Sequence, residues 1–193
     1  LGMTVAEALR TDLAQSSALT VLTRAALREN LSLMRRSEES RITYDLAREI
    51  ATREGAKAVL DGEVTQLCHG YLFAGCLVAT LDGQEPATFR EVADNEDALI
   101  AAMGKQGKAV RERSGESLRS IQATSELTRV TTASLPALRK YVEGNRLASE
   151  EGEEERGLAL LEEAVELDST FALAWRKIAV ISSNLRLDRA RVI

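Results

Sequence analysis

The sequence has few aromatic residues and few side chains suited to metal or disulfide chemistry. Phe, Trp and Tyr make up 4% of the 193 residues, so Leu, Val, Ile and Ala have to form the hydrophobic core. Two cysteines, Cys68 and Cys76, are too few for a disulfide framework, and we expect both to be small strand residues. With His69 as the one histidine, the chain also lacks the usual ligands of a structural zinc site. We therefore expect no metal and no cofactor.

Basic charge in excess and long apolar runs are also missing. The 25 Lys and Arg against 30 Asp and Glu give a net charge of −5, which provides no basic face for nucleic acid. No apolar run is long enough to span a bilayer, and no signal peptide begins the sequence. The 45% of hydrophobic and 28% of charged residues are typical of a soluble globular chain with one domain or two small ones.

The first third of the chain is predicted to be mainly helical. Thr4 with Glu7 three residues later is typical of a capping box, and Gly55 is typical of a helix C-terminus. LTVL at 19–22 predicts a short strand between the first two helices. Apolar residues recur at helical spacing in residues 4–15, 24–34 and 44–55.

The middle of the chain predicts an antiparallel β-meander covered on one face by helices. Its three strand-like runs are separated by His69-Gly70 and Asp82-Gly83, which are hairpin signals. Residues 95–118 then predict one long helix. The strand-like runs are AKAVLDGEVTQL (56–67), GYLFAGCLVATL (70–81) and PATFREVA (86–93).

These patterns predict an α+β protein. Residues 1–121 are expected to form an N-terminal α/β domain, 122–133 a linker, and 134–193 an all-α part. We expect the following side chains to be largely buried in the α/β domain: Val5, Leu9, Leu13, Leu27, Leu46, Ile50, Val59, Leu77, Val78, Phe89, Leu99 and Val110.

The all-α part has the spacing of a tetratricopeptide repeat. Tyr141 and Trp175 differ by 34 positions, which is the period of that repeat. About one and a half repeats fit, whereas three or more are ordinarily needed, so we expect the chain to be part of a longer protein and Trp175 to be incompletely enclosed. The alternative is an ordinary helical hairpin. The residues expected to pack the repeat are Tyr141, Gly157, Leu161, Ala164, Trp175 and Ala179.

Candidate catalytic groups are few. Asp61 and Glu63 share one strand face and could act as an acid–base pair, but an exposed position is the favoured interpretation. The adjacent Cys68 and His69 would point to opposite faces of a strand, which argues against a nucleophilic pair. MGKQGKA (103–109) lacks the first glycine and the final Ser or Thr of a phosphate-binding loop. We expect no catalytic residue.

The order of the segments resembles the TolB N-terminal-like (FlgO-like) α/β domain followed by tetratricopeptide repeats. In that family a strand precedes the first helix, and it is missing here. The resemblance is carried by VAEALRTDLAQSSALTVLTR, DLAREIATREGAKAVLDGEV, LVATLDGQEPATFRE and ALLEEAVELDSTFALAW.

The resemblance implies a part of a bacterial signalling protein, above all a membrane-anchored serine/threonine protein kinase. The chain itself has no kinase motif, so the expected role is a non-catalytic sensory or protein-interaction region. The helical repeat would bind a protein or peptide, or a copy of itself. The favoured location is the extracytoplasmic side of the membrane, with the cytoplasm left open. The alternatives are a periplasmic envelope-assembly protein, or the effector region of a transcription regulator or adenylate cyclase.

Overall fold

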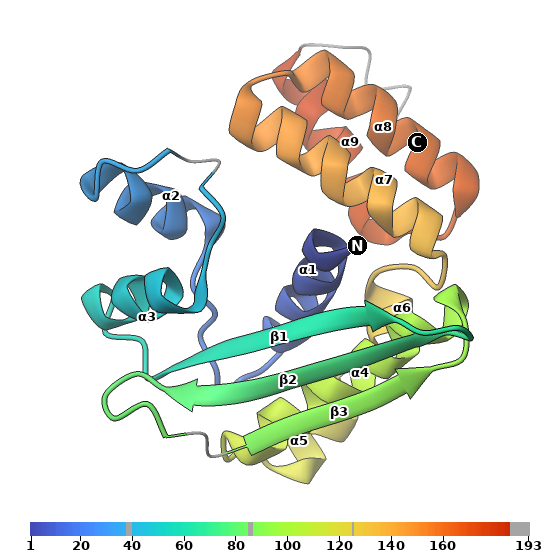
Figure 1. Ribbon diagram of the computed structural model, residues 1–193. Helices are drawn as coiled ribbons and strands as arrows, with labels where there is room; N and C mark the ends of the chain where they lie inside the picture. Colours follow the sequence, from blue (N-terminus) through green and yellow to red (C-terminus); the bar gives the residue numbers. More distant parts are fainter. Residues whose placement is uncertain (38–39, 85–86, 125, 186–193) are drawn as a thin grey trace.

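The computed structural model describes residues 1–37, 40–84, 87–124 and 126–185, which form a mixed α+β structure around a three-stranded antiparallel sheet (Figure 1). In that part of the chain, no helix is both long enough and apolar enough to cross a membrane. The elements are α1 (Gly2–Leu13), α2 (Arg24–Leu33), α3 (Tyr44–Arg53), β1 (Ala58–Gln66), β2 (Tyr71–Ala79), β3 (Ala87–Ala93), α4 (Glu96–Arg113), α5 (Leu118–Ala123), α6 (Leu127–Val130), α7 (Leu135–Arg146), a π-helical turn (Leu147–Glu151), α8 (Glu154–Leu167) and α9 (Ala172–Asn184).

The three predicted helices of the first third are present, with different caps. The expected capping box at Thr4 is wrong, because α1 already begins at Gly2 and Thr4 is buried inside it. Thr23 and Thr43 cap α2 and α3 instead, each accepting a hydrogen bond from a backbone N–H of the first turn. Gly55 follows α3 with φ of 66°, which confirms the predicted stop.

The sheet has the predicted meander order, β1-β2-β3. Its first turn is centred on Cys68 and His69, one residue earlier than expected, and Leu67 N–H donates to Gly70 C=O at 3.0 Å. Gly70 has φ of 86°, and a Cβ there would lie 2.1 Å from the carbonyl oxygen of Ala93. The glycine therefore closes the turn rather than forming its centre.

The strand expected at residues 19–22 does not form. The segment is irregular and has no strand beside it in the described part of the chain. Apolar alternation produces a strand only where a neighbouring strand supplies backbone partners. A side chain of α1 contacts the segment instead, since Arg10 Nη1 donates a hydrogen bond to the carbonyl of Leu22 at 2.7 Å.

The helix expected at 95–118 is shorter than predicted. α4 ends at Arg113, and Gly115 follows with φ of 88°, so the chain turns there. Leu118 lies outside α4 and is 58% exposed at the start of α5, which Ser117 caps. The apolar spacing that includes Leu118 is therefore coincidental.

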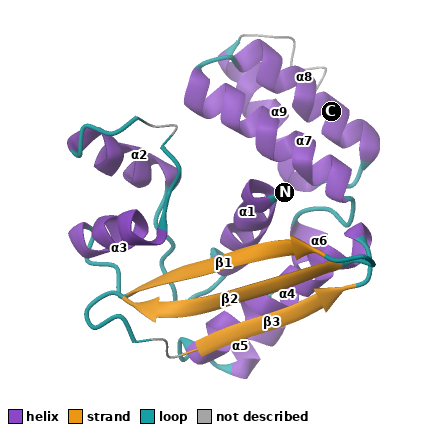
Figure 2. Ribbon diagram, in the orientation of Figure 1, coloured by secondary structure: helices purple, strands orange, loops and turns teal. Residues whose placement is uncertain are grey.

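The main core lies between one face of the sheet and two helices. Tyr71 and Phe73 of β2 point to this face and pack with Leu9 of α1 and Met103 of α4. α2 and α3 form a separate pair near the start of β1, with its own small core (Figure 2). Eight of the twelve predicted core side chains are buried, and the four that are only half-buried are Leu27, Val59, Leu77 and Phe89.

The same core continues into the helices of the C-terminal part. Residues 122–133, expected to be a linker, include α6, whose Leu127 is 2% exposed and packs in the core. Leu138 of α7 and Ile178 of α9 belong to the same cluster as the residues beneath the sheet. The segment 122–133 is therefore packed, and the predicted domain boundaries stay predictions.

Two glycines allow α7 and α8 to pack closely. A Cβ on Gly144 would lie 2.8 Å from the carbonyl oxygen of Gly157, and a Cβ on Gly157 would lie 2.6 Å from that of Gly144. Ala148 is equally close, because its Cβ would be 2.6 Å from a Cβ on Gly157. Any larger side chain would push the two helices apart.

Gly157→Ala is therefore expected to destabilise the protein. The clash should outweigh the helix propensity gained, lowering the free energy of unfolding by about 1–2 kcal/mol in urea titrations followed by circular dichroism. Gly2→Ala is the control, since no atom lies within 4 Å of its added Cβ. Equal stability of Gly157→Ala and wild type would show that the α7–α8 contact is not as close as described.

Candidate functional site

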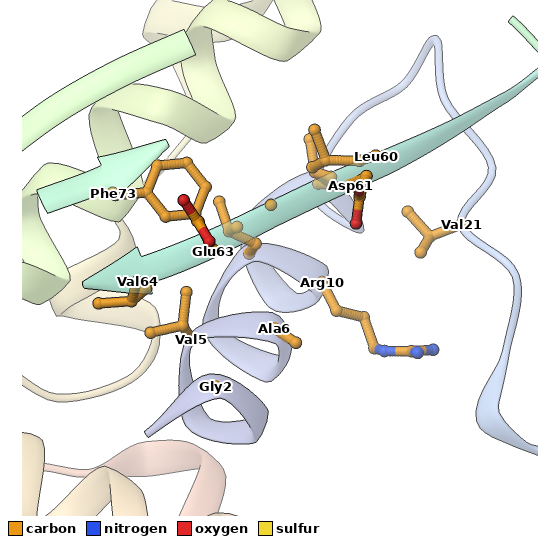
Figure 3. Close-up of a pocket in the computed structure, with 13 residues that line it drawn as sticks. Gly2, Val5, Ala6, Arg10, Val21, Leu60, Asp61, Glu63, Val64 and Phe73 are labelled. Atoms are coloured by element: carbon orange, nitrogen blue, oxygen red, sulfur yellow. The ribbon is translucent and has the colours of Figure 1, made fainter. Parts of the chain in front are cut away.

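A cleft of about 310 Å³ lies between α1, the edge strand β1 and the segment 19–22 (Figure 3). Apolar side chains of α1 and the ring of Phe73 line one side of the cleft, and Val21 of the 19–22 segment lies across the opening from α1. Its lining thus combines apolar side chains with a length of open strand. The lining residues are Gly2, Val5, Ala6, Leu9, Arg10, Leu13, Val21, Leu60, Asp61, Gly62, Glu63, Val64 and Phe73.

The edge of β1 presents unpaired backbone groups to this cleft. Thr80 N–H donates to Lys57 C=O at 2.9 Å, so the odd-numbered residues of β1 bond toward β2. The N–H and C=O groups of Leu60, Gly62 and Val64 consequently point the other way. β1 is an edge strand, and these groups have no backbone partner in the part of the chain that the structure describes. Such an edge can accept one more strand.

Asp61 and Glu63 alternate with these residues and point to the opposite face of the sheet. Both are exposed, and neither forms an ion pair among the described residues. The sequence pattern thus predicted their shared face correctly. Their place on an exposed strand edge makes them two free negative charges at the rim of the cleft.

Ion pairs hold the wall formed by 19–22. Arg10 bridges the two sides, because it contacts Glu7 at 3.5 Å and donates to the carbonyl of Leu22. Glu7 also pairs with Arg24, at 3.2 Å, where α2 begins. These contacts join α1 to the start of α2, at the two ends of the 19–22 segment. They therefore fix the position of this segment relative to β1.

A buried ion pair anchors the other end of that segment. Arg111 donates to both carboxylate oxygens of Glu116, at 2.9 and 2.8 Å, and both side chains are almost completely buried. Ser16 donates to the same carboxylate, and its Oγ accepts the N–H groups of Ala18 and Leu19 at 3.1 Å. The hydrogen bond from Arg111, followed by those from Ser16 and Ser120, holds the pKa of Glu116 well below its ordinary range.

Asp12 lies next to this ion pair with an unsatisfied oxygen. It is 1% exposed, its Oδ2 has no hydrogen-bond partner, and a Cβ on Gly107 would lie 1.9 Å from that oxygen. Burial raises its pKa from 3.8 to about 6, although Arg111 and Lys108 act in the opposite direction. A carboxyl group in this position is therefore sensitive to pH near neutrality.

The repeat-packing residues do not line the cleft; they lie along the C-terminal helices. Gly157, Leu161 and Ala164 of α8 are buried, whereas Ala179 of α9 is half-buried. Tyr141 of α7 is half-buried, and its ring centroid lies 5.0 Å from that of Phe171, which is fully buried. Trp175 is 38% exposed, with Nε1 donating to Ser169 C=O at 2.9 Å.

The remaining sequence candidates do not converge on one site. The expectation that both cysteines are strand residues is wrong for Cys68, which is exposed beside His69 in the β1–β2 turn, whereas Cys76 lies in β2 opposite Asp61. Among the described residues, no three His, Cys, Asp or Glu side chains are grouped as metal ligands. Sequence reasoning missed the cleft, for which the isolated Gly62 in a strand was the available signal.

Comparison with protein-family models finds no match, and searches of curated proteins and of solved structures likewise find no significant one. The TolB-like and tetratricopeptide assignments therefore stay predictions, and the cleft has to be interpreted from its own chemistry.

Asp12→Asn should change how stability depends on pH. The raised pKa means that folding favours the neutral carboxyl, so this stabilisation is complete below pH 3.8 and is lost as the pH rises through about 6. At pH 8 the variant should therefore be more stable than wild type by about 1–2 kcal/mol. The full shift, at ~1.4 kcal/mol per unit, sets the upper limit at roughly 3 kcal/mol.

Urea titrations at pH 4 and pH 8 measure this difference. At pH 4 the two proteins should have nearly the same free energy of unfolding. The exposed Glu112 of α4 supplies the control, Glu112→Gln, whose difference from wild type should be the same at both pH values. An Asp12→Asn difference that does not grow with pH would contradict the assigned pKa.

Proposed function

We propose that this chain is a non-catalytic protein-interaction region of a bacterial signalling protein, and that the α1–β1 cleft receives an extended peptide segment of a partner. The observation that carries the proposal is the row of unpaired backbone groups at Leu60, Gly62 and Val64 beside an apolar floor. Backbone groups of a sheet edge bind any extended chain, while side-chain pockets next to them select among sequences.

The walls of the cleft support a binding role because their positions are specified by polar contacts. Arg10 and Ser16 each hold the 19–22 segment through hydrogen bonds to its backbone. A rigid, preformed cleft loses less conformational entropy when a ligand binds than a mobile loop would. The cleft therefore has the properties of a built recognition site.

The C-terminal helices α7, α8 and α9 have a supporting role in this proposal. α7 packs against α1, and the two helices share the core residues Val5, Leu138 and Val142. The C-terminal helices thus support the floor of the cleft, and the exposed Trp175 and Val180 of α9 are available for a further contact. The signalling context, including a kinase domain elsewhere in the protein, rests on the family resemblance.

Selection from a phage-displayed library of random heptapeptides tests the cleft directly. Wild-type protein should enrich a set of peptides, and Ala6→Trp should abolish that enrichment by filling the cleft. Ala6 is exposed on α1 and lines the cleft, so its replacement leaves the core intact.

Ala101→Trp is the matched control, because Ala101 is exposed on α4 and does not line the cleft. It should enrich the same peptides as wild type. If no peptide is enriched, or if Ala6→Trp enriches the same set, the cleft is not a peptide-binding site.

A further inference from the structure

We infer that the partner segment is a β-strand of another protein that adds to the edge of β1, with a bulky apolar residue at its centre and Lys or Arg on either side. The inference rests on the proposed function and names the chemistry of its partner. It follows from the length of the open edge, the gap at Gly62 and the two carboxylates beside it.

The open edge sets the length and direction of the strand. The residues of β1 that line the cleft, Leu60–Val64, span about 16 Å at ~3.3 Å per residue. Five residues of an added strand match this length. Antiparallel pairing is the commoner arrangement, and in it the central residue exchanges both backbone hydrogen bonds with Gly62.

The side chain opposite Gly62 has space and an apolar surface to contact. Gly62 pairs with Gly75 of β2, and the ring of Phe73 covers both glycines, with Cζ 3.4 and 3.3 Å from where their Cβ atoms would be. An apolar or aromatic residue at the centre of the added strand would lie on this face, against Phe73 and the apolar side of α1.

The side chains on either side of the centre meet negative charge. Asp61 and Glu63 bond toward β2, so relative to an added strand they occupy non-hydrogen-bonded positions, where opposing Cα atoms are about 4.5 Å apart. A Lys or Arg opposite each carboxylate would form a cross-strand ion pair. Neither carboxylate has a competing cation among the described residues.

A second copy of the chain is disfavoured as the occupant by the same charges. Two β1 edges paired antiparallel about Gly62 would place Asp61 of each copy opposite Glu63 of the other. Four carboxylates would then be close together, and like charges directly opposite destabilise a strand pair. The edge therefore selects a basic strand from a different protein.

The probe is the peptide Thr-Val-Lys-Phe-Lys-Val-Thr, titrated into the whole chain and followed by isothermal calorimetry at low salt. Phe would face Gly62, and the two Lys would face Asp61 and Glu63. We expect saturable binding that weakens as salt is added, because the exposed ion pairs are screened. N-methylation of the Phe should abolish binding by removing its backbone donor, and Glu in place of both Lys should weaken it about tenfold.

Charge exchange on the protein separates recognition from unspecific attraction. The double variant Asp61→Lys/Glu63→Lys should bind the Lys peptide about tenfold more weakly and bind the Glu peptide about as well as wild type binds the Lys peptide. Glu112→Lys/Glu166→Lys makes the same change in net charge at exposed positions on α4 and α8, and should bind like wild type.

Three outcomes would overturn the inference. Library peptides that need the open cleft but bind the charge-exchanged variant unchanged would leave the proposed function intact and refute the basic partner. Dimers in analytical ultracentrifugation that dissociate in Ala6→Trp, which fills the cleft, would identify a second copy as the occupant. Failure of every peptide to bind would refute the inference together with the proposed function.

Discussion

The buried ion pair between Arg111 and Glu116 is the contact on which the geometry of the cleft depends. It joins the end of α4 to the turn before α5, and through Ser16 it also fixes the end of α1. Removing either partner would leave an uncompensated buried charge, a change that typically costs about 3–5 kcal/mol. The polypeptide leaves α1 in one direction because of this pair, and that direction places the 19–22 segment across from β1.

α1 has two tasks that compete for its apolar surface. Val5 and Leu9 complete the core against α4 and the sheet, yet both also line the cleft. A helix lying beneath the interior of a sheet would be covered completely, whereas α1 lies beside the edge strand β1, the strand it contacts most. The cleft therefore arises because the layer of helices extends beyond the edge strand β1.

The elements were predictable wherever local pattern decides the outcome. The α2 and α3 helices, the meander and the glycine stop at Gly55 follow from periodicity and turn residues. The 19–22 strand was mispredicted because a strand also needs a neighbour, which residue pattern does not report. The end of α4 was missed because the apolar period continued to Leu118 beyond Gly115.

The site was less predictable than the fold, because contacts across long sequence distances create it. Ser16 and Glu116 are 100 positions apart, and the open side of β1 becomes apparent only once the strand order is known. Asp61 and Glu63 were noticed in the sequence, but as a possible acid–base pair. Because the neighbouring backbone groups of Leu60, Gly62 and Val64 are unpaired, the two carboxylates instead become charges beside an open strand edge.

An exposed strand edge carries a general risk, since it can pair with any other edge and start aggregation. Charged side chains are a common protection, and Asp61 and Glu63 provide it here. The protection is selective, because carboxylates repel an identical edge and attract a basic one. A protein that had only to prevent aggregation could cover this edge with a helix or a proline. Leaving it open between two fixed walls, with charges of one sign, retains the capacity to bind while restricting what binds.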